Sequence, residues 1–91
     1  MREIVLDTET TGLDPEKGDR LVEIGCVELF NHMVDGETYH QYINPQFAVD
    51  AEALAVHGLS NEFLADKPLF ERIVDDFIEF EQTAILYPSV F

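Results

Sequence analysis

Two acidic residues, one position apart, follow a short apolar run near the start of the chain. The run is Ile4-Val5-Leu6, typical of a strand buried on both faces, and the acids are Asp7 and Glu9. Because side chains alternate along a strand, we expect both carboxylates on one face, about 6.6 Å apart along the backbone. Such a pair can bind the hard cations Mg²⁺ or Mn²⁺, and two ions about 3.5–4 Å apart promote phosphodiester hydrolysis. On spacing alone, two solvated acids at a strand end remain the simpler interpretation.

The residues after the acids have the chemistry of a turn that approaches a nucleotide. Thr10-Thr11-Gly12 supplies hydroxyls, backbone N–H groups and a glycine that can adopt positive φ. The alternative is a turn that only ends the strand, because Gly12-Leu13-Asp14-Pro15 has turn chemistry in either case.

A second candidate pair, Glu52 and His57, lies in the middle of the chain. The two residues are about one and a half helical turns apart, so both can face one cleft. The alternative for His57 is a helix-terminal histidine that bonds the last carbonyls or interacts with the helix dipole. His32 and His40 show no metal-ligand spacing, and we expect structural roles for them.

The first half of the chain predicts an antiparallel meander. We expect strands over 2–8, 20–30 and 38–43, with a Pro- and Gly-containing loop over 14–19. A turn is expected over 31–36, where Asp35-Gly36 is the strongest local signal.

The second half predicts helices and one more strand. Asp50 is expected to cap a short helix that ends at Gly58, and Ser60 to cap a single turn over 61–64. An amphipathic helix is expected over 68–81, and a last strand over 83–87.

Length and composition indicate one small domain. Ninety-one residues with 46% hydrophobic residues allow a core, and no apolar run is long enough for a membrane span or resembles a secretory signal. The single cysteine, Cys26, cannot form an internal disulfide and is expected to be a buried small hydrophobe in a reducing cytoplasm.

The net charge of −14 is unusual for a protein that binds DNA. Bound divalent ions could offset the acids locally, or the surface binds no nucleic acid on its own, and composition favours the second explanation. A third class, an acidic mimic of nucleic acid, rests on charge alone.

The string Asp7-Thr8-Glu9-Thr10-Thr11-Gly12-Leu13 resembles the first motif of the DEDD-type 3′–5′ exonucleases, and most closely the proofreading subunits of bacterial DNA polymerase III. The resemblance extends through RLVEIGCVEL, YINP, EALAVHGLS and FLADKP, in that order, over roughly residues 1–82. It implies an α/β, ribonuclease-H-like exonuclease fold, of which this chain holds the N-terminal half with a mixed sheet (β-β-β-α-α-β). In that fold the first strand is central and the last strand here lies parallel beside it.

The resemblance also implies roles for the candidate residues. Asp7 and Glu9 would be catalytic acids that hold Mg²⁺ or Mn²⁺, two ions in the intact family and one or none here. The implied substrate is the single-stranded 3′ end of DNA during replication. The residues implied to contact it are Thr8, Thr10, Thr11, Gly12, Leu13, Glu52 and His57.

Two later motifs of the family have no counterpart in this sequence. The third acid belongs to an H-N-A-x-F-D stretch, where this chain reads Tyr87-Pro88-Ser89-Val90-Phe91. The H-x-x-x-x-D motif, which supplies the base and the fourth acid, has no match, nor has the C-terminal tail that contacts the DNA polymerase III catalytic subunit. We therefore expect one partial exonuclease domain over 1–91 with a divergent tail over about 82–91, truncated and with little activity alone.

The alternative function is a non-catalytic fragment that associates with itself or a partner. A truncated sheet leaves an open edge and an uncovered apolar face. The sequence therefore predicts a homo-oligomer, as a symmetric dimer that covers this surface.

Overall fold

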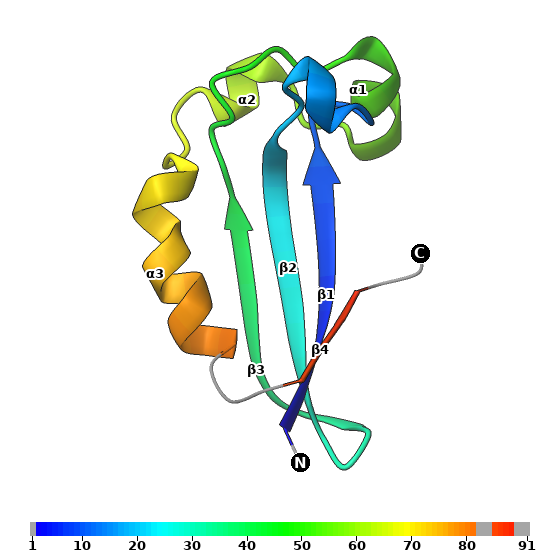
Figure 1. Ribbon diagram of the computed structural model, residues 1–91, viewed down its shortest axis with the longest axis vertical. Helices are drawn as coiled ribbons and strands as arrows, with labels where there is room; N and C mark the ends of the chain where they lie inside the picture. Colours follow the sequence, from blue (N-terminus) through cyan, green and yellow to red (C-terminus); the bar gives the residue numbers. More distant parts are fainter. Residues whose placement is uncertain (1, 82–84, 89–91) are drawn as a thin grey trace.

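A four-stranded mixed sheet forms the centre of the computed structural model, which describes residues 2–81 and 85–88. The sheet has the spatial order β3-β2-β1-β4. β1 pairs antiparallel with β2 and parallel with β4, while β2 and β3 pair antiparallel. The predicted meander and the parallel last strand are therefore confirmed (Figure 1). The strands are β1 (Arg2–Thr10), β2 (Leu21–Phe30), β3 (Met33–Tyr42) and β4 (Ile85–Pro88).

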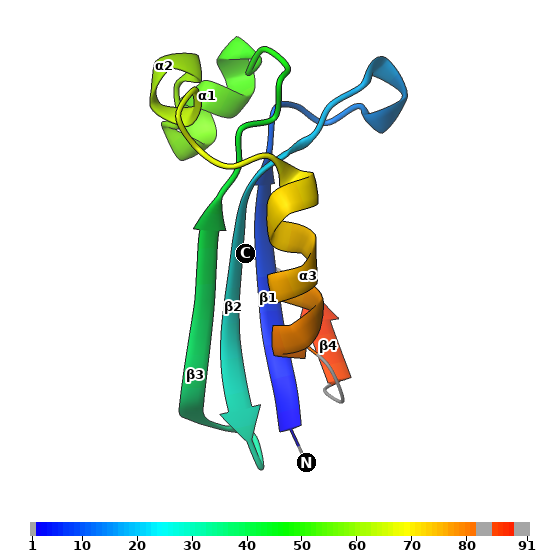
Figure 2. The same ribbon diagram turned by 90° about the vertical axis from the view of Figure 1, so that its left-hand side faces the viewer.

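The helices lie against one face and one end of this sheet. A 3-10 helix, η1 (Pro15–Lys17), connects β1 to β2, and α1 (Ala51–His57), α2 (Asn61–Leu64) and α3 (Phe70–Glu81) follow β3. Figure 2 shows α3 along one face of the sheet, with α1 and α2 at the end where β1 finishes. Over residues 2–81, no helix has the length and apolar character needed to cross a membrane.

The core lies between the sheet and α3 because both present apolar residues there. Along β2 the even-numbered residues from Val22 to Glu28 are buried, as expected for a strand covered on one face. From α3, Phe77 and Phe80 place their rings 6.0 and 5.6 Å from the ring of Tyr39. The buried cluster consists of Ile4, Ile24, Cys26, Ile43 and Ile73.

Cys26 is the buried small hydrophobe that the sequence predicts. Only 2% of its surface is exposed, and burial raises the pKa of its thiol to about 11.

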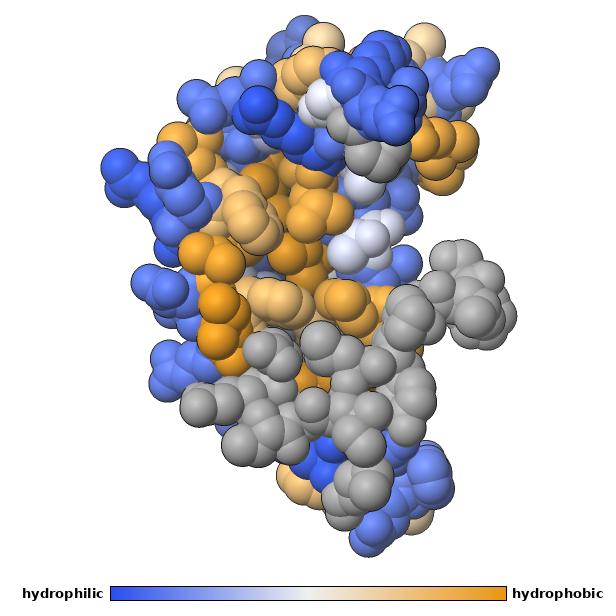
Figure 3. Space-filling view, in the orientation of Figure 1, coloured by the Kyte–Doolittle hydropathy of each residue, from blue (hydrophilic) through white to orange (hydrophobic). Residues whose placement is uncertain are grey.

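Beside the core, Figure 3 shows hydrophobic side chains gathered on the face that carries α3. Leu6 and Leu21 are partly buried there, packed against the core.

The turn between β2 and β3 is shorter than predicted. Asn31-His32 forms it, with positive φ angles of 51° and 65°, and Phe30 pairs directly with Met33. Positive φ at both central residues is the geometry of a type I′ turn, whose twist suits a two-residue hairpin. The predicted turn over 31–36 is therefore wrong, and β3 begins at Met33.

The Asp35-Gly36 sequence, which suggested the longer turn, lies inside β3. It falls where the β2–β3 register shifts, between the pairs that involve Val27 and Leu29. The Glu28 carboxylate lies against the Cα of Gly36, so that a side chain at this position would collide with it. Gly36 therefore does not form a turn. It leaves space for the side chain of Glu28 from the neighbouring strand.

Other boundaries differ by a few residues. β1 runs to Thr10 rather than residue 8, and α3 begins at Phe70 rather than Pro68. The last strand begins at Ile85. The remainder of that prediction, residues 83 and 84, and most of the tail over 82–91, including Phe91, lie outside the described residues.

The helix caps follow the sequence, with one exception. Gly58 ends α1 with φ 72° and donates its N–H to the Leu54 carbonyl, and Ser60 Oγ accepts the Phe63 N–H at 3.1 Å. Asp50 occupies the N-cap of α1, but its side chain makes no capping hydrogen bond. That carboxylate lies instead 3.2 Å from Lys17 Nζ.

Candidate active site

Asp7 and Glu9 lie on the sheet face opposite α3. Ile4 and Leu6 point into the core beneath α3, and the alternation of β1 directs the two acids the other way. Asp7 is exposed and Glu9 is half-buried. Across residues 2–81 and 85–88, neither carboxylate forms a hydrogen bond or an ion pair. Both acids are therefore available to a cation from one side of the sheet.

A further acid, from β2, lies beside this pair. Glu23 of β2 is directly opposite Glu9 in the register, while Gly25 is opposite Asp7. The Glu23 carboxylate is bonded to Nε2 of His40, which lies on β3. Among the described residues, no three His, Cys, Asp or Glu side chains come close enough together to hold a metal ion.

A pocket of about 450 Å³ opens where β1 ends, between the turn that follows and helix α1. It brings together residues that are more than forty positions apart in the chain. Asp7, Thr8 and Thr11 of the predicted set do not line it. The predicted residues that do line it are Glu9, Thr10, Gly12, Leu13, Glu52 and His57.

His57 connects the end of α1 to the end of β1. Its Nδ1 accepts the Leu59 N–H at 3.0 Å, so the ring proton resides on Nε2, which donates to the Thr10 carbonyl at 2.9 Å. The neutral ring therefore uses both nitrogens within the chain. The histidine bonds a carbonyl of β1 and not the last carbonyls of its own helix.

Thr11 is an anchor of the turn and not part of the pocket surface. It is fully buried, and its N–H and carbonyl pair with Arg20 and Asp50, each at 2.8 Å. Its hydroxyl accepts the Arg20 N–H at 3.0 Å and donates to Asp19 Oδ1 at 2.7 Å. These bonds join the turn after β1 to the start of β2 and to the segment before α1.

Three charged residues for which the sequence predicted no role in the site, Lys17, Asp19 and Asp50, also line this pocket. A Cβ atom on Gly12 would lie 2.5 Å from Asp19 Oδ2 and closer still to Asp50 Oδ2, so glycine leaves the space for both carboxylates. Lys17 Nζ bonds both oxygens of Asp50, at 3.2 and 3.3 Å. Hydrogen bonding and charge from Asp50 raise the pKa of Lys17, and hydrogen bonds from the Asp14 N–H and the Thr11 hydroxyl lower the pKa of Asp19.

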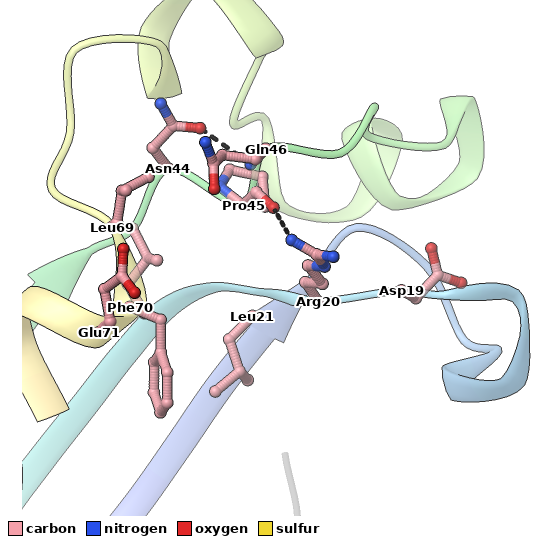
Figure 4. Close-up of a pocket in the computed structure, with 10 residues that line it drawn as sticks. Asp19, Arg20, Leu21, Asn44, Pro45, Gln46, Leu69, Phe70 and Glu71 are labelled. Atoms are coloured by element: carbon pink, nitrogen blue, oxygen red, sulfur yellow. Dashed lines mark hydrogen bonds between the residues drawn. The ribbon is translucent and has the colours of Figure 1, made fainter.

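A second pocket, of about 490 Å³, lies between the start of β2, the segment that follows β3 and the start of α3 (Figure 4). Arg20 donates to the Pro45 carbonyl at 3.2 Å at its rim, and the side chains of Leu21 and Phe70 lie alongside each other below. None of the nine predicted site residues lines it. The candidate active site is therefore the first pocket together with the acid face of β1.

A family model described as exonuclease matches residues 4–89. A DNA polymerase III subunit epsilon of Rickettsia conorii is 58% identical over 80 residues, which cover 88% of this chain and 35% of that protein. The protein of the same name from Rickettsia prowazekii is 50% identical over 93 aligned positions, covering 100% of this chain and 41% of its own length. The chain thus spans well under half the length of these relatives.

Among solved structures, the nuclease domain of 3′hExo, a DEDDh family member bound to rAMP, matches with a TM-score of 0.75. The match covers 96% of this chain and 50% of that one, at 17% identity. The likeness shows the fold that the sequence resemblance implies.

Proposed function

The chain belongs to the exonuclease family, and on that premise we propose that it forms the nucleotide-binding side of a metal-dependent 3′–5′ proofreading exonuclease. The substrate would be the single-stranded 3′ end of DNA, hydrolysed during replication in the cytoplasm. The relatives from Rickettsia conorii and Rickettsia prowazekii bear the name DNA polymerase III subunit epsilon, which supports a role in DNA replication.

One observation carries this proposal. The pocket at the end of β1 unites Glu9 and the Gly12-Leu13 turn with Glu52 and His57 of α1, although these segments are far apart in the chain. Its volume of about 450 Å³ lies within the range of pockets that enclose a small ligand. A terminal nucleotide bound there would have its phosphate near the acid face of β1 and its base near Leu13.

Asp7 and Glu9 would hold the divalent ion. Their carboxylates share one face and have no partner within the described residues, which fits a cation site with further ligands from elsewhere. Bound there, Mg²⁺ or Mn²⁺ would activate water and offset charge at the scissile phosphodiester. Gly12, Leu13 and Glu52 would bind and orient the nucleotide, and Thr10 and His57, which bond each other, would form the wall beside it. Thr8 and the buried Thr11 would support the strand end.

We propose that this polypeptide alone has little or no nuclease activity. Mg²⁺ requires near-octahedral coordination, and two acids provide few of its ligands. The motifs for the third and fourth acids and the base have no counterpart in the sequence. Because catalytic groups act as a unit, losing several of them lowers the rate by orders of magnitude.

The metal site can be tested by calorimetric titration with Mn²⁺. The wild-type chain should show weak binding that Asp7→Ala abolishes. Asp66→Ala is the matched control, because Asp66 is an exposed acid beyond the pocket, and among the described residues its carboxylate pairs only with Lys67. Equal binding by the wild type and Asp7→Ala would remove the assigned ion site.

The activity can be tested with a mispaired DNA 3′ end and Mn²⁺. We expect turnover several orders of magnitude below that of an intact proofreading exonuclease. Comparable turnover would confirm the exonuclease assignment and contradict the proposed inactivity.

The second candidate function is a non-catalytic module that associates with itself. Hydrophobic side chains gather on the sheet face beside α3, and Phe70 and Ile78 of that helix are exposed. Sedimentation should then show a dimer at micromolar concentration, whereas a monomer would exclude this function.

A further inference from the structure

Asp19 joins the two ends of the turn that carries Leu13. Its Oδ1 accepts the Thr11 hydroxyl at 2.7 Å, and its Oδ2 accepts the Asp14 N–H at 2.9 Å. The two residues between these contacts are Gly12 and Leu13. One carboxylate therefore closes a loop around the tip of the turn.

One end of this loop is fixed independently. The buried Thr11 is held through its backbone by Arg20 and Asp50. The opposite end, at Asp14, receives the N–H groups of Lys17 and Asp19 on its carbonyl, at 3.1 and 3.2 Å. The Asp19 side chain connects this segment to the anchored threonine, while the Thr10 hydroxyl donates to the Gly12 carbonyl at 2.6 Å at the start of the tip.

Leu13 itself has almost no packing to hold it. It is 96% exposed although it lines the pocket. Because few side chains pack against Leu13, the direction of its side chain follows from the backbone conformation. If that backbone is already ordered, a ligand that binds against Leu13 does not have to pay the conformational entropy of ordering it. The direction of Leu13 thus depends on what fixes residues 12–14.

Asp19 is suited to this task because it is held as an anion. The Asp14 N–H and the Thr11 hydroxyl lower its pKa, so the carboxylate accepts both bonds at neutral pH. Gly12 allows the close approach, since a Cβ there would meet Asp19 Oδ2 at 2.5 Å.

We propose that Asp19 is a positioning residue that holds the Gly12-Leu13 tip rigid, so that Leu13 forms a preset wall for the terminal base. The inference rests on the proposed nucleotide-binding function of the pocket. Asp19 also lines the pocket, and the role assigned to it is to position the tip.

The test uses NMR relaxation of the full 91-residue chain. In the wild type, the backbone amides of Leu13 and Asp14 should have order parameters of about 0.85. In Asp19→Asn, the order parameters of the same two amides should fall below about 0.6. Asparagine has one acceptor oxygen where the carboxylate has two, so it cannot accept both the Thr11 hydroxyl and the Asp14 N–H. Asp66→Asn, which removes the same charge from an exposed site, is the control and should leave both values unchanged.

Thr11→Val provides a second route if Asp19→Asn does not fold. It removes the hydroxyl that Asp19 binds, keeps the shape of the side chain, and should loosen the same two amides. Wild-type order parameters at Leu13 and Asp14 in both variants would overturn the proposal.

Titration with deoxythymidine monophosphate and Mg²⁺ separates this inference from the proposed function. We expect shifts at Gly12, Leu13 and His57 in the wild type, and binding about threefold to tenfold weaker in Asp19→Asn. If the wild type binds no nucleotide, the proposed function fails while the relaxation data still decide the role of Asp19. Unchanged affinity in Asp19→Asn despite a loosened tip would overturn the role of Leu13 as a preset wall.

Discussion

Nε2 of His57 donates a hydrogen bond to the carbonyl of Thr10 across 2.9 Å, and so joins the last turn of α1 to the last residue of β1. The Leu59 N–H, bound to Nδ1, fixes the tautomer that makes this possible. The wall of the pocket formed by α1 is thereby attached to the strand that carries both acids.

Replacing His57 by alanine should therefore detach α1 from β1. We expect a loss of about 0.5–1.5 kcal/mol of unfolding free energy for each neutral hydrogen bond removed. Urea denaturation measures this loss. Val56→Ala is the control on the same helix, because Val56 is 80% exposed and its replacement should change stability little. Equal stabilities of the two variants would show that the histidine does not anchor the helix.

Gly12→Ala should be poorly tolerated, because the added methyl group would collide with the carboxylates of Asp19 and Asp50. Forcing a group into filled space typically costs about 1–3 kcal/mol. The matched control is Gly25→Ala, where the nearest atoms would lie at an ordinary 3.9 Å. Thermal unfolding of both variants should show a large loss for the first and almost none for the second.

The stability supplied by Asp19 should disappear in acid. Its folded-state pKa is lowered, so its contribution is present above the unfolded value of about 3.9 and is lost as pH falls through the folded pKa. The difference in melting temperature between wild type and Asp19→Asn should therefore be constant near neutral pH and shrink below about pH 4. A difference independent of pH down to pH 2 would contradict this linkage.

Cys26 should be unreactive toward thiol reagents in the native state. It is buried, and a pKa of about 11 leaves almost no thiolate at pH 8. Modification by a disulfide reagent should be slow in buffer and rapid in denaturing urea. Fast reaction of the native chain would mean that the core opens readily.

Local patterns explain why much of the fold was predictable. The apolar content of residues 20–30 indicates a strand and the stripe over 68–81 indicates a helix, and both elements were confirmed. Ile73 and Phe77 of the stripe pack in the core, but Phe70 and Ile78, which were also expected there, are exposed because Phe70 begins the helix and Ile78 lies at the edge of the stripe.

The length of the turn between β2 and β3 was wrongly predicted. Asn31 and His32 adopt positive φ, but the pair contains no glycine that would have indicated a tight turn there. At Asp35-Gly36, glycine serves the approach of Glu28, a tertiary contact that local turn chemistry does not reveal.

The candidate site also contains residues that local sequence predicts and residues that it does not. Asp7 and Glu9 are neighbours in one strand, so their common face follows from strand geometry alone. Asp19 and Lys17 come from the loop after β1, where acids and lysines are usually solvated. Their place in the site depends on tertiary structure and cannot be predicted from local sequence. Lys17 bonds to Asp50, and Asp50 reaches the turn only when the segment before α1 folds back against Thr11.

The parallel pairing of β1 with β4 affects how the chain can assemble. It joins Glu3 to Ile85, so the chain must be synthesised through Ile85 before the central strand gains its second neighbour. Contacts so distant in sequence slow folding, and until they form, one edge of β1 has free backbone groups that another chain could pair with. During synthesis, the strand that bears both acids would thus be an open edge at which other chains can add and aggregate.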